Sequence, residues 1–223
     1  AEEGDPAFRD EIAAMRERHV SMCREVVPAG RRSEVEAELN IMLDRLSCIC
    51  EGIFLLQVLP SKTLDEVVSF GERMSSQIVS AAIPGAELYD SLAFIRTVAQ
   101  RGENVVDMDA TCRLIRDAFR STGKAPAVVP GFIARDSASG DITNLGRGGS
   151  DYTASLIAAA LDAELLEIWT DVDGFMTADP KIIRTSYVIE EMSYAEAMEL
   201  CNFGAKVIYP PTLYAVCAKG IPI

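Results

Sequence analysis

The 223-residue sequence has little histidine or tryptophan, with one of each, and its six cysteines include no C-x-x-C pair. Because His19 stands alone in a charged segment, it cannot complete a zinc ligand set, and we predict no metal site. The dispersed cysteines fit the reduced, mostly buried thiols of a cytoplasmic protein. The sequence also lacks an apolar run of transmembrane length, and its acidic first residues do not resemble a signal peptide.

Positive charge is scarce as well. Lys and Arg number 21 against 34 Asp and Glu, which gives a formal net charge of -13. A surface this acidic repels phosphates and anionic lipids, so we expect neither a nucleic acid nor a membrane as a partner. Any anionic ligand must therefore be met by a local concentration of positive groups. Hydrophobic residues make up 49% of the chain, which is enough for a sizeable core.

The hydrophobic pattern predicts a helical N-terminal part followed by an α/β part. Apolar residues recur at helical spacing in three N-terminal segments, and Ser33 is the predicted N-cap of the second. Further along, the apolar runs 125–134 and 164–170 are predicted buried strands. They alternate with predicted helices, one of them capped by Ser150 and another by Ser193. This alternation predicts a mainly parallel sheet with helices on its faces.

The segment "LGRGGSDYTA", residues 145–154, lies between a predicted strand and a predicted helix. Glycines without a Cβ let a ligand touch the backbone, and a helix N-terminus attracts anions. Arg147 adds a planar charged group that suits a carboxylate or phosphate. The segment is neither a P-loop nor a G-x-G-x-x-G fingerprint, because Asp151 stands where the last glycine would be. The alternative is an ordinary glycine turn with a surface arginine.

Two further segments are candidate ligand contacts. The loop "TDVDGFMTADPK", residues 170–181, follows a predicted strand and could contact an adenosine through backbone and hydroxyl groups, or be a structural turn. Lys206 follows a helix that ends near Phe203, where lysine usually compensates the helix dipole. The neighbouring Gly204 would let Lys206 reach phosphate oxygens instead.

Four segments of the sequence, taken in chain order, resemble the signatures of aspartokinases, which are members of the amino-acid kinase fold. They are "FGERMSS", "GFIARDSASGDITNLGRGGSDYTASLIAAAL", "EIWTDVDGFMTADP" and "MSYAEAMELCNFGAKVIYP", and the match runs from about Leu64 to the C-terminus. The segments "EIWTDVDG" and "AMELCNFGAK" are most similar to those of bifunctional aspartokinase–homoserine dehydrogenases. The resemblance implies a three-layer α/β/α sandwich with a mainly parallel central sheet. It implies one catalytic domain over 1–223, truncated at both ends, with a helical part over about 1–60 and a nucleotide-binding half over about 126–223.

The resemblance also implies roles for particular residues. Glu72 would meet the ammonium group of aspartate, Arg147 an aspartate carboxylate, and Asp151 would hold catalytic lysines in place. The implied catalytic residues are Asp151, Lys206 and Arg147. The implied substrate-binding residues are Glu72, Arg147, Gly148, Gly149 and Ser150. The implied cofactor-binding residues are Thr170, Asp171, Gly174, Asp179, Lys181 and Lys206.

The function that the resemblance implies is transfer of the γ-phosphoryl group of ATP to the side-chain carboxylate of L-aspartate. This is the first step toward lysine, threonine, methionine and isoleucine. The expected cofactors are ATP and Mg²⁺ held mainly by ATP, with NADP only if the parent chain has a dehydrogenase domain. The expected full-length protein is a homo-oligomer. Because the family's opening Lys-Phe-Gly-Gly-Thr-Ser strand is absent from residues 1–223, we expect this segment alone to be inactive.

Three other functions remain open at this point. A glutamate, carbamate or nucleoside-monophosphate kinase would share the fold, although "FGERMS" with "GRGGSD" favours aspartate. A non-catalytic ligand-binding module would fit a segment without the lysine strand. A nicotinamide-binding domain is less favoured, because no G-x-G-x-x-G motif fits.

Overall fold

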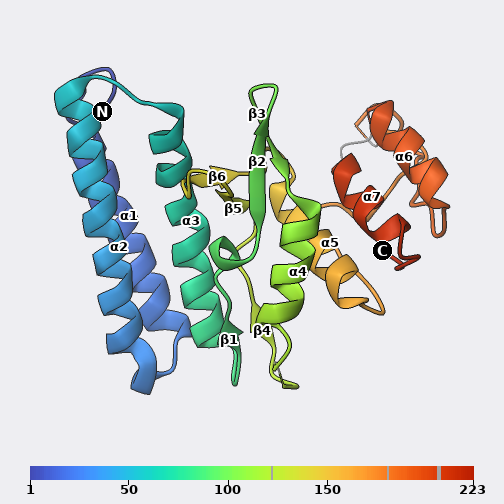
Figure 1. Cartoon of the computed structure of the whole chain (residues 1–223), viewed down its shortest axis with the longest axis horizontal. Helices are drawn as coiled ribbons and strands as arrows, with labels where there is room; N and C mark the ends of the chain where they lie inside the picture. The colour runs from blue at the N-terminus through green and yellow to red at the C-terminus, as the bar shows by residue number, and fades with distance from the viewer. Residues whose placement is uncertain (122, 180, 205–206) are drawn as a thin grey trace.

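A computed structural model of the chain describes residues 1–121, 123–179, 181–204 and 207–223. Helices α1 (Phe8–Val26), α2 (Ala29–Leu56) and α3 (Ser61–Ala82) pack into an N-terminal bundle, seen from blue to green in Figure 1. The core of the bundle includes Leu39, Leu43, Phe70 and Met74, each at most 1% exposed. These residues recur at helical spacing, so the predicted helical N-terminal part is confirmed.

The predicted start of the second helix at Ser33 is wrong. Helix α2 begins at Ala29, directly after Pro28, so Ser33 lies inside the helix. Proline fixes φ near the helical value, and here it makes the sharp corner between α1 and α2. Glu36, three residues after Ser33, accepts hydrogen bonds from Arg24 on α1 at 2.9 and 3.0 Å.

The strands form two small sheets between the bundle and the later helices. A two-stranded parallel sheet pairs β1 (Glu87–Leu88) with β4 (Ala127–Val128). A four-stranded sheet has the order β3-β2-β5-β6, from Glu103–Val106, Arg96–Gln100, Ile133–Asp136 and Ile142–Asn144. In it β2 and β5 run parallel, and the two outer pairings are antiparallel. Of the described sheets, the two-stranded one is parallel and the four-stranded one is mixed.

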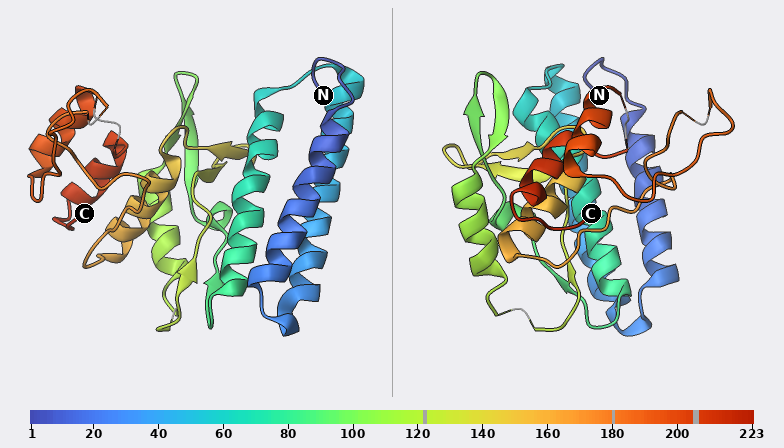
Figure 2. Two further views of the ribbon diagram at one scale, coloured as in Figure 1. Left: turned by 180° about the vertical axis from the view of Figure 1, so that it is seen from behind. Right: turned by 90° about the vertical axis from the view of Figure 1, so that its right-hand side faces the viewer.

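Helices cover both sides of these strands. Figures 1 and 2 show α3 on one side, and α4 (Met108–Ala118) with α5 (Gly149–Leu161) on the other. A second core lies between the four-stranded sheet and these two helices, and includes Phe94, Ile95, Ile115 and Leu156. A short 3₁₀ helix, Ser91–Ala93, leads into β2. The predicted α/β class with helices on both faces is confirmed.

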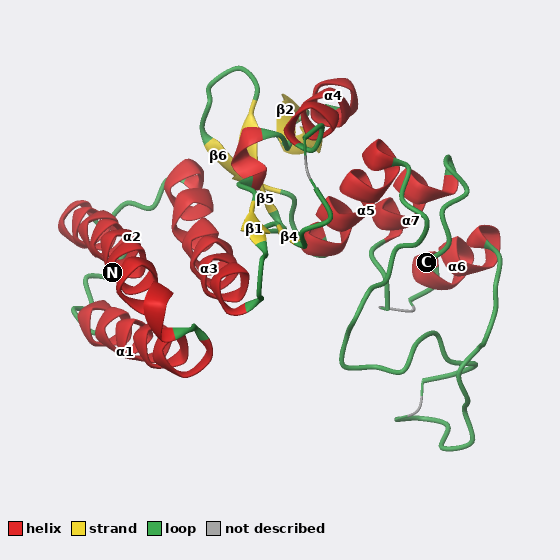
Figure 3. Cartoon of the chain, turned by 90° about the horizontal axis from the view of Figure 1, so that it is seen from below, coloured by secondary structure: helices red, strands yellow, loops and turns green. Residues whose placement is uncertain are grey.

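The C-terminal part holds two short helices and long connections, as Figure 3 shows. Helix α6 (Tyr194–Asn202) begins with the predicted cap, because Ser193 and Glu196 form a reciprocal capping box. Helix α7 (Pro210–Cys217) packs against α5. Among the described residues, none of the helices combines the length and the apolar character that crossing a membrane requires.

Of the two predicted buried strands, the first is only partly correct and the second is wrong. The run 125–134 is divided between β4 and the start of β5, because Pro130 has no N–H to donate and Phe132 has a left-handed φ of 69°. The run 164–170 is not a strand. Its Leu166 N–H bonds the Pro222 carbonyl at 2.9 Å, but the side chain of Trp169 is 88% exposed.

Candidate functional site

The glycine-rich segment forms a tight turn between β6 and α5. Gly146 and Gly148 have φ values of 71° and 76°, which favour glycine, and Arg147 is exposed between them. Gly148 is the N-cap of α5, and its carbonyl accepts from the Tyr152 N–H at 3.0 Å. The prediction that Ser150 caps this helix is therefore wrong, because the helix begins one residue before it.

Close packing also requires glycine around this turn. A Cβ on Gly149 would lie 2.9 Å from the Leu145 Cβ, and one on Gly131 would lie 2.8 Å from the Ser150 Cα. A Cβ on Gly148 would lie only 2.4 Å from the Cβ of Tyr209. The start of α5 is thus held tightly against the β4–β5 connection and against the residue that precedes α7.

The N-termini of α5 and α7 meet at this contact, because Gly148 is the N-cap of one helix and Tyr209 of the other. The dipole of α5 places partial positive charge there, and the first N–H groups of α5 have no partner within the helix. Helix α7 contributes less, because it begins with Pro210 and Pro211, which have no N–H to donate. Arg147 adds a full positive charge at the same turn. An acidic protein therefore has a local region at this turn that attracts anions.

Asp151 lies in the first turn of α5 and is half-buried. Burial raises the pKa of its carboxyl group. Its carboxylate has no hydrogen bond or ion pair with any described residue. Lys206, which was predicted to act with it, lies outside the described residues. A half-buried carboxylate without a partner is the kind of group that contacts a cationic side chain or a ligand.

Glu72 has a similar environment on α3. It is half-buried, its carboxylate has no bonding partner in the described parts of the chain, and burial raises its pKa. Next to it, Gly71 is exposed, and a Cβ there would meet no atom within 4 Å. The space beside Gly71 is therefore open. The structure therefore leaves Glu72 accessible for a contact with a positive group.

The predicted nucleotide residues lie in the C-terminal part. Thr170 and Gly174 line a cavity of about 1070 Å³ whose wall also includes Ser193 and Glu196 at the start of α6. The Thr170 hydroxyl donates to Asp171 at 3.1 Å, and the Asp179 carboxylate accepts from the Lys181 N–H at 2.8 Å. The structure thus brings Thr170 and Gly174 to one cavity.

This cavity is separate from the glycine turn. Its lining includes none of Glu72, Arg147 and Asp151, and it does not include Asp171, Asp179 or Lys181, which are exposed. The wall is rich in carboxylates, with Glu190, Glu191 and Glu196. Within the described ranges, no three His, Cys, Asp or Glu side chains are close enough together to hold a metal ion.

The sequence analysis missed two residues that shape the turn. Tyr209 packs on Gly148, and its ring lies edge-on to that of Tyr152 at a centroid distance of 6.3 Å. Asn144 accepts from the Gly146 N–H at 3.0 Å and donates to Asp65 on α3. The signal for Asn144 was present, since an asparagine two residues before a glycine is typical of such turns. Nothing in the local sequence pointed to Tyr209.

Comparisons with known proteins agree with this arrangement. The family model "Amino acid kinase family" matches residues 4–223. The chain is 35% identical over 194 residues to lysine-sensitive aspartokinase 3 of Escherichia coli (strain K12), covering 85% of this chain and 42% of that protein. It is 32% identical over 193 residues to the bifunctional aspartokinase/homoserine dehydrogenase of Buchnera aphidicola, covering 85% and 24%.

A solved structure gives the same result. The crystal structure of E. coli aspartokinase III in complex with aspartate and ADP is 31% identical, with a TM-score of 0.87, over 97% of this chain and 48% of that chain. The chain therefore spans less than half the length of each of these relatives. Since the family model covers nearly every residue and the fold agrees, the chain belongs to the amino acid kinase family.

Proposed function

We propose that the intact protein is an aspartate kinase, which transfers the γ-phosphoryl group of ATP to the side-chain carboxylate of L-aspartate. The observation that carries this proposal is the exposed Arg147 in a glycine turn at the N-terminus of α5. A half-buried Glu72 on α3, whose carboxylate has no partner among the described residues, supports it. Further support comes from the aspartokinases to which the chain is similar, one of them solved with aspartate and ADP.

The proposed reaction needs charge stabilisation rather than a base. A carboxylate oxygen of aspartate forms a bond to the γ-phosphorus while the bond to the bridging oxygen of ADP breaks, and no proton moves. Arg147 binds an aspartate carboxylate with two parallel hydrogen bonds, and Glu72 binds the ammonium group. The N–H group of Ser150 faces the reacting anions, whereas that of Gly149 donates to the Gly146 carbonyl at 3.0 Å. Asp151 orients lysines such as Lys206.

The nucleotide is proposed to bind in the C-terminal half, over about 126–223. The large cavity beside Thr170 and Gly174 suits the uncharged adenosine rather than the phosphates, because the acidic wall of the cavity would repel phosphates. The phosphates extend instead toward the positive turn at Arg147 and toward Lys206. Mg²⁺ arrives on the ATP phosphates and neutralises charge there. We further propose that the intact protein acts as a cytoplasmic homo-oligomer in amino-acid biosynthesis.

The test is an ADP-release assay on the intact protein, with the acyl phosphate trapped as a hydroxamate. Aspartate should stimulate ADP release, whereas glutamate, carbamate and nucleoside monophosphates should not. Asp151→Asn should lower kcat by about 10²-fold with modest KM changes, since misplaced lysines lose contacts made only in the transition state. Arg147→Lys should raise the KM for aspartate, because a point charge cannot replace a bidentate group.

Two outcomes would overturn the proposal. Stimulation by another acceptor, with none by aspartate, would reassign the substrate within the family. Wild-type kinetics in both variants would make the glycine turn a structural feature only. Tryptophan fluorescence provides an independent check, because Trp169 is the sole tryptophan, is exposed and adjoins Thr170. ATP should change its emission in the wild-type protein.

A further inference from the structure

The side chain of Asn144 connects helix α3 to the glycine turn. Its Nδ2 group donates to the Asp65 carboxylate on α3, and its Oδ1 accepts from the Gly146 N–H at 3.0 Å. Both Asn144 and Asp65 are partly buried. Burial raises the pKa of Asp65, and the hydrogen bond from Asn144 opposes that change. A hydrogen bond to a carboxylate away from bulk water is stronger than a neutral one.

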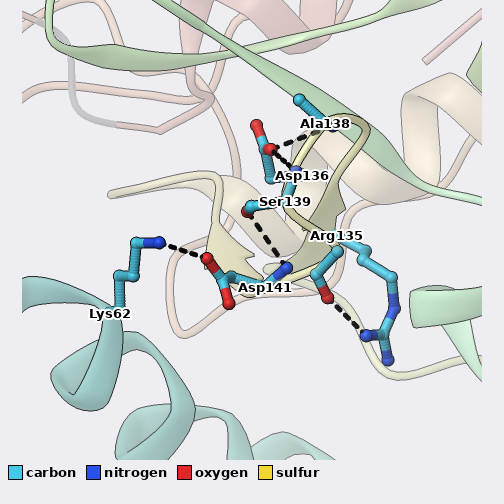
Figure 4. A network of polar contacts seen from close by, with 7 residues as sticks. Lys62, Arg135, Asp136, Ala138, Ser139 and Asp141 are labelled. Carbon is cyan, nitrogen blue, oxygen red and sulfur yellow. Dashed lines mark hydrogen bonds and ion pairs between the residues drawn. The ribbon is translucent and has the colours of Figure 1, made fainter.

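A second contact joins the same two elements at the other end of β6. Lys62, one turn before Asp65 on α3, pairs with Asp141, which precedes β6 (Figure 4). The turn that holds Asp141 is itself hydrogen-bonded, since Asp136 accepts from the N–H groups of Ala138 and Ser139. The Lys62–Asp141 pair is exposed and contributes little. Of these two polar contacts, the one between Asp65 and Asn144 is therefore the stronger link between β6 and α3.

Both proposed aspartate contacts are positioned from this junction. Glu72 lies seven residues after Asp65, which is two helical turns, on the same face of α3 and about 10 Å along its axis. Arg147 lies three residues after Asn144, in the turn whose first N–H is held by Asn144. A substrate bound between Glu72 and Arg147 depends on the distance between α3 and the turn. A shift of about 1 Å in such a distance can reduce a rate by about 10²-fold.

We infer that Asn144 and Asp65 are positioning residues for the aspartate site, which set the place of Arg147 relative to Glu72. The inference rests on the proposed function, since it concerns how that substrate is held. Neither residue touches the substrate. Their effect should therefore appear mainly in the KM for aspartate and much less in the KM for ATP, because the adenosine is proposed to bind beside Thr170 and Gly174, in a cavity whose lining includes neither Asn144 nor Asp65.

The test exchanges the two side chains in the intact protein. Asn144→Asp can still accept from the Gly146 N–H, but its carboxylate faces that of Asp65 and the link to α3 is lost. We expect the KM for aspartate to rise about 10-fold or more, with that for ATP changed less than about 2-fold. Asp65→Asn keeps an acceptor oxygen for the Asn144 amide, so it should raise the KM for aspartate less than Asn144→Asp does. The double variant restores a donor opposite a carboxylate and should return the KM to within about 3-fold of wild type.

The double variant also serves as the charge control, because it keeps the carboxylate that Asn144→Asp introduces near Arg147. Asn144→Ser removes the link without adding charge and should raise the KM for aspartate selectively as well, which covers a poorly folded Asn144→Asp. Equal rises in both KM values, or no recovery in the double variant, would overturn the positioning role. A wild-type protein that does not phosphorylate aspartate would overturn the proposed function, and this inference with it.

Discussion

At the scale of single residues, the carboxylate of Glu72, which has no partner among the described residues, should lower the stability of the protein. Its folded-state pKa is raised by burial, so the folded protein binds its proton more tightly than the unfolded chain does. Ionisation at neutral pH therefore opposes folding. Glu72→Gln should raise the Tm at neutral pH, and the gain should shrink as the pH falls through the folded pKa, where Glu72 itself becomes protonated. Thermal unfolding followed across this pH range measures the effect.

Glu17→Gln is the matched control for this change. Glu17 also lies mid-helix, on α1, but it is exposed and has no hydrogen bond or ion pair among the described residues. Glutamate and glutamine have similar helix propensities, so this substitution should leave the Tm nearly unchanged. Equal responses of the two variants would show that burial of Glu72 has no energetic effect. In the kinase assay, Glu72→Gln should at the same time raise the KM for aspartate, so stability and binding change in opposite directions.

At the scale of elements, two glycines of one turn offer a matched comparison. Gly146 and Gly148 both have left-handed φ, but a Cβ at Gly146 would meet nothing within 4 Å, whereas one at Gly148 would overlap Tyr209. Gly146→Ala should lower the free energy of unfolding by about 1–2 kcal/mol, because alanine is strained in the left-handed backbone conformation. Gly148→Ala should cost about 1–3 kcal/mol more, for the overpacking. Urea unfolding of both variants measures the difference, and equal losses would show that Tyr209 moves aside freely.

The helices could be predicted from the sequence because each buries one face, as Phe70 and Met74 do on α3. The strands were less predictable, because an apolar run becomes a strand only where another strand pairs with it. Residues 164–170 have the composition of a buried strand, but Leu166 has a single backbone bond to Pro222 and Trp169 is exposed. Ser150 was predicted as a cap from residue type alone. The left-handed Gly148 determines where α5 begins.

The site was predictable only where its residues are close together in the sequence. Arg147 and Asp151 stand in one short segment, so local sequence places them together at the start of α5. The contacts of Asn144 with Asp65 and of Gly148 with Tyr209 join residues 79 and 61 positions apart along the chain. Such contacts depend on how the elements pack in three dimensions. The roles given to Glu72 and to the residues of 170–181 remain predictions.

At the scale of the whole molecule, packing is uneven along the chain. The bundle core includes Leu39, Leu43 and Met74, with no exposed surface, whereas the connection before α6 exposes Ile182 by 79% and Tyr187 by 69%. Segments with few buried apolar contacts open most readily. Trypsin should therefore cut first after the exposed Lys181 or Arg184, before any site in α1–α3. Mass spectrometry of the early fragments identifies the first cut.

Nucleotide provides the control for this prediction. If adenosine binds beside Thr170 and Gly174, a non-hydrolysable ATP analogue should slow the first cut by mass action, whereas aspartate alone should have a smaller effect. Early cleavage within the bundle would contradict the predicted order. Equal protection by NADPH would indicate a different nucleotide.

The contact of Gly148 with Tyr209 also bears on the order in which the chain is completed during synthesis. The bundle α1–α3 consists of consecutive segments, so it can form while the rest is still being made. The turn at Arg147 emerges next, but the residue that packs on Gly148 is translated 61 positions later. The anion-attracting turn therefore reaches its final shape only after that later segment has left the ribosome. In a nascent chain, the bundle α1–α3 can therefore fold early, and the turn at Arg147 is completed last.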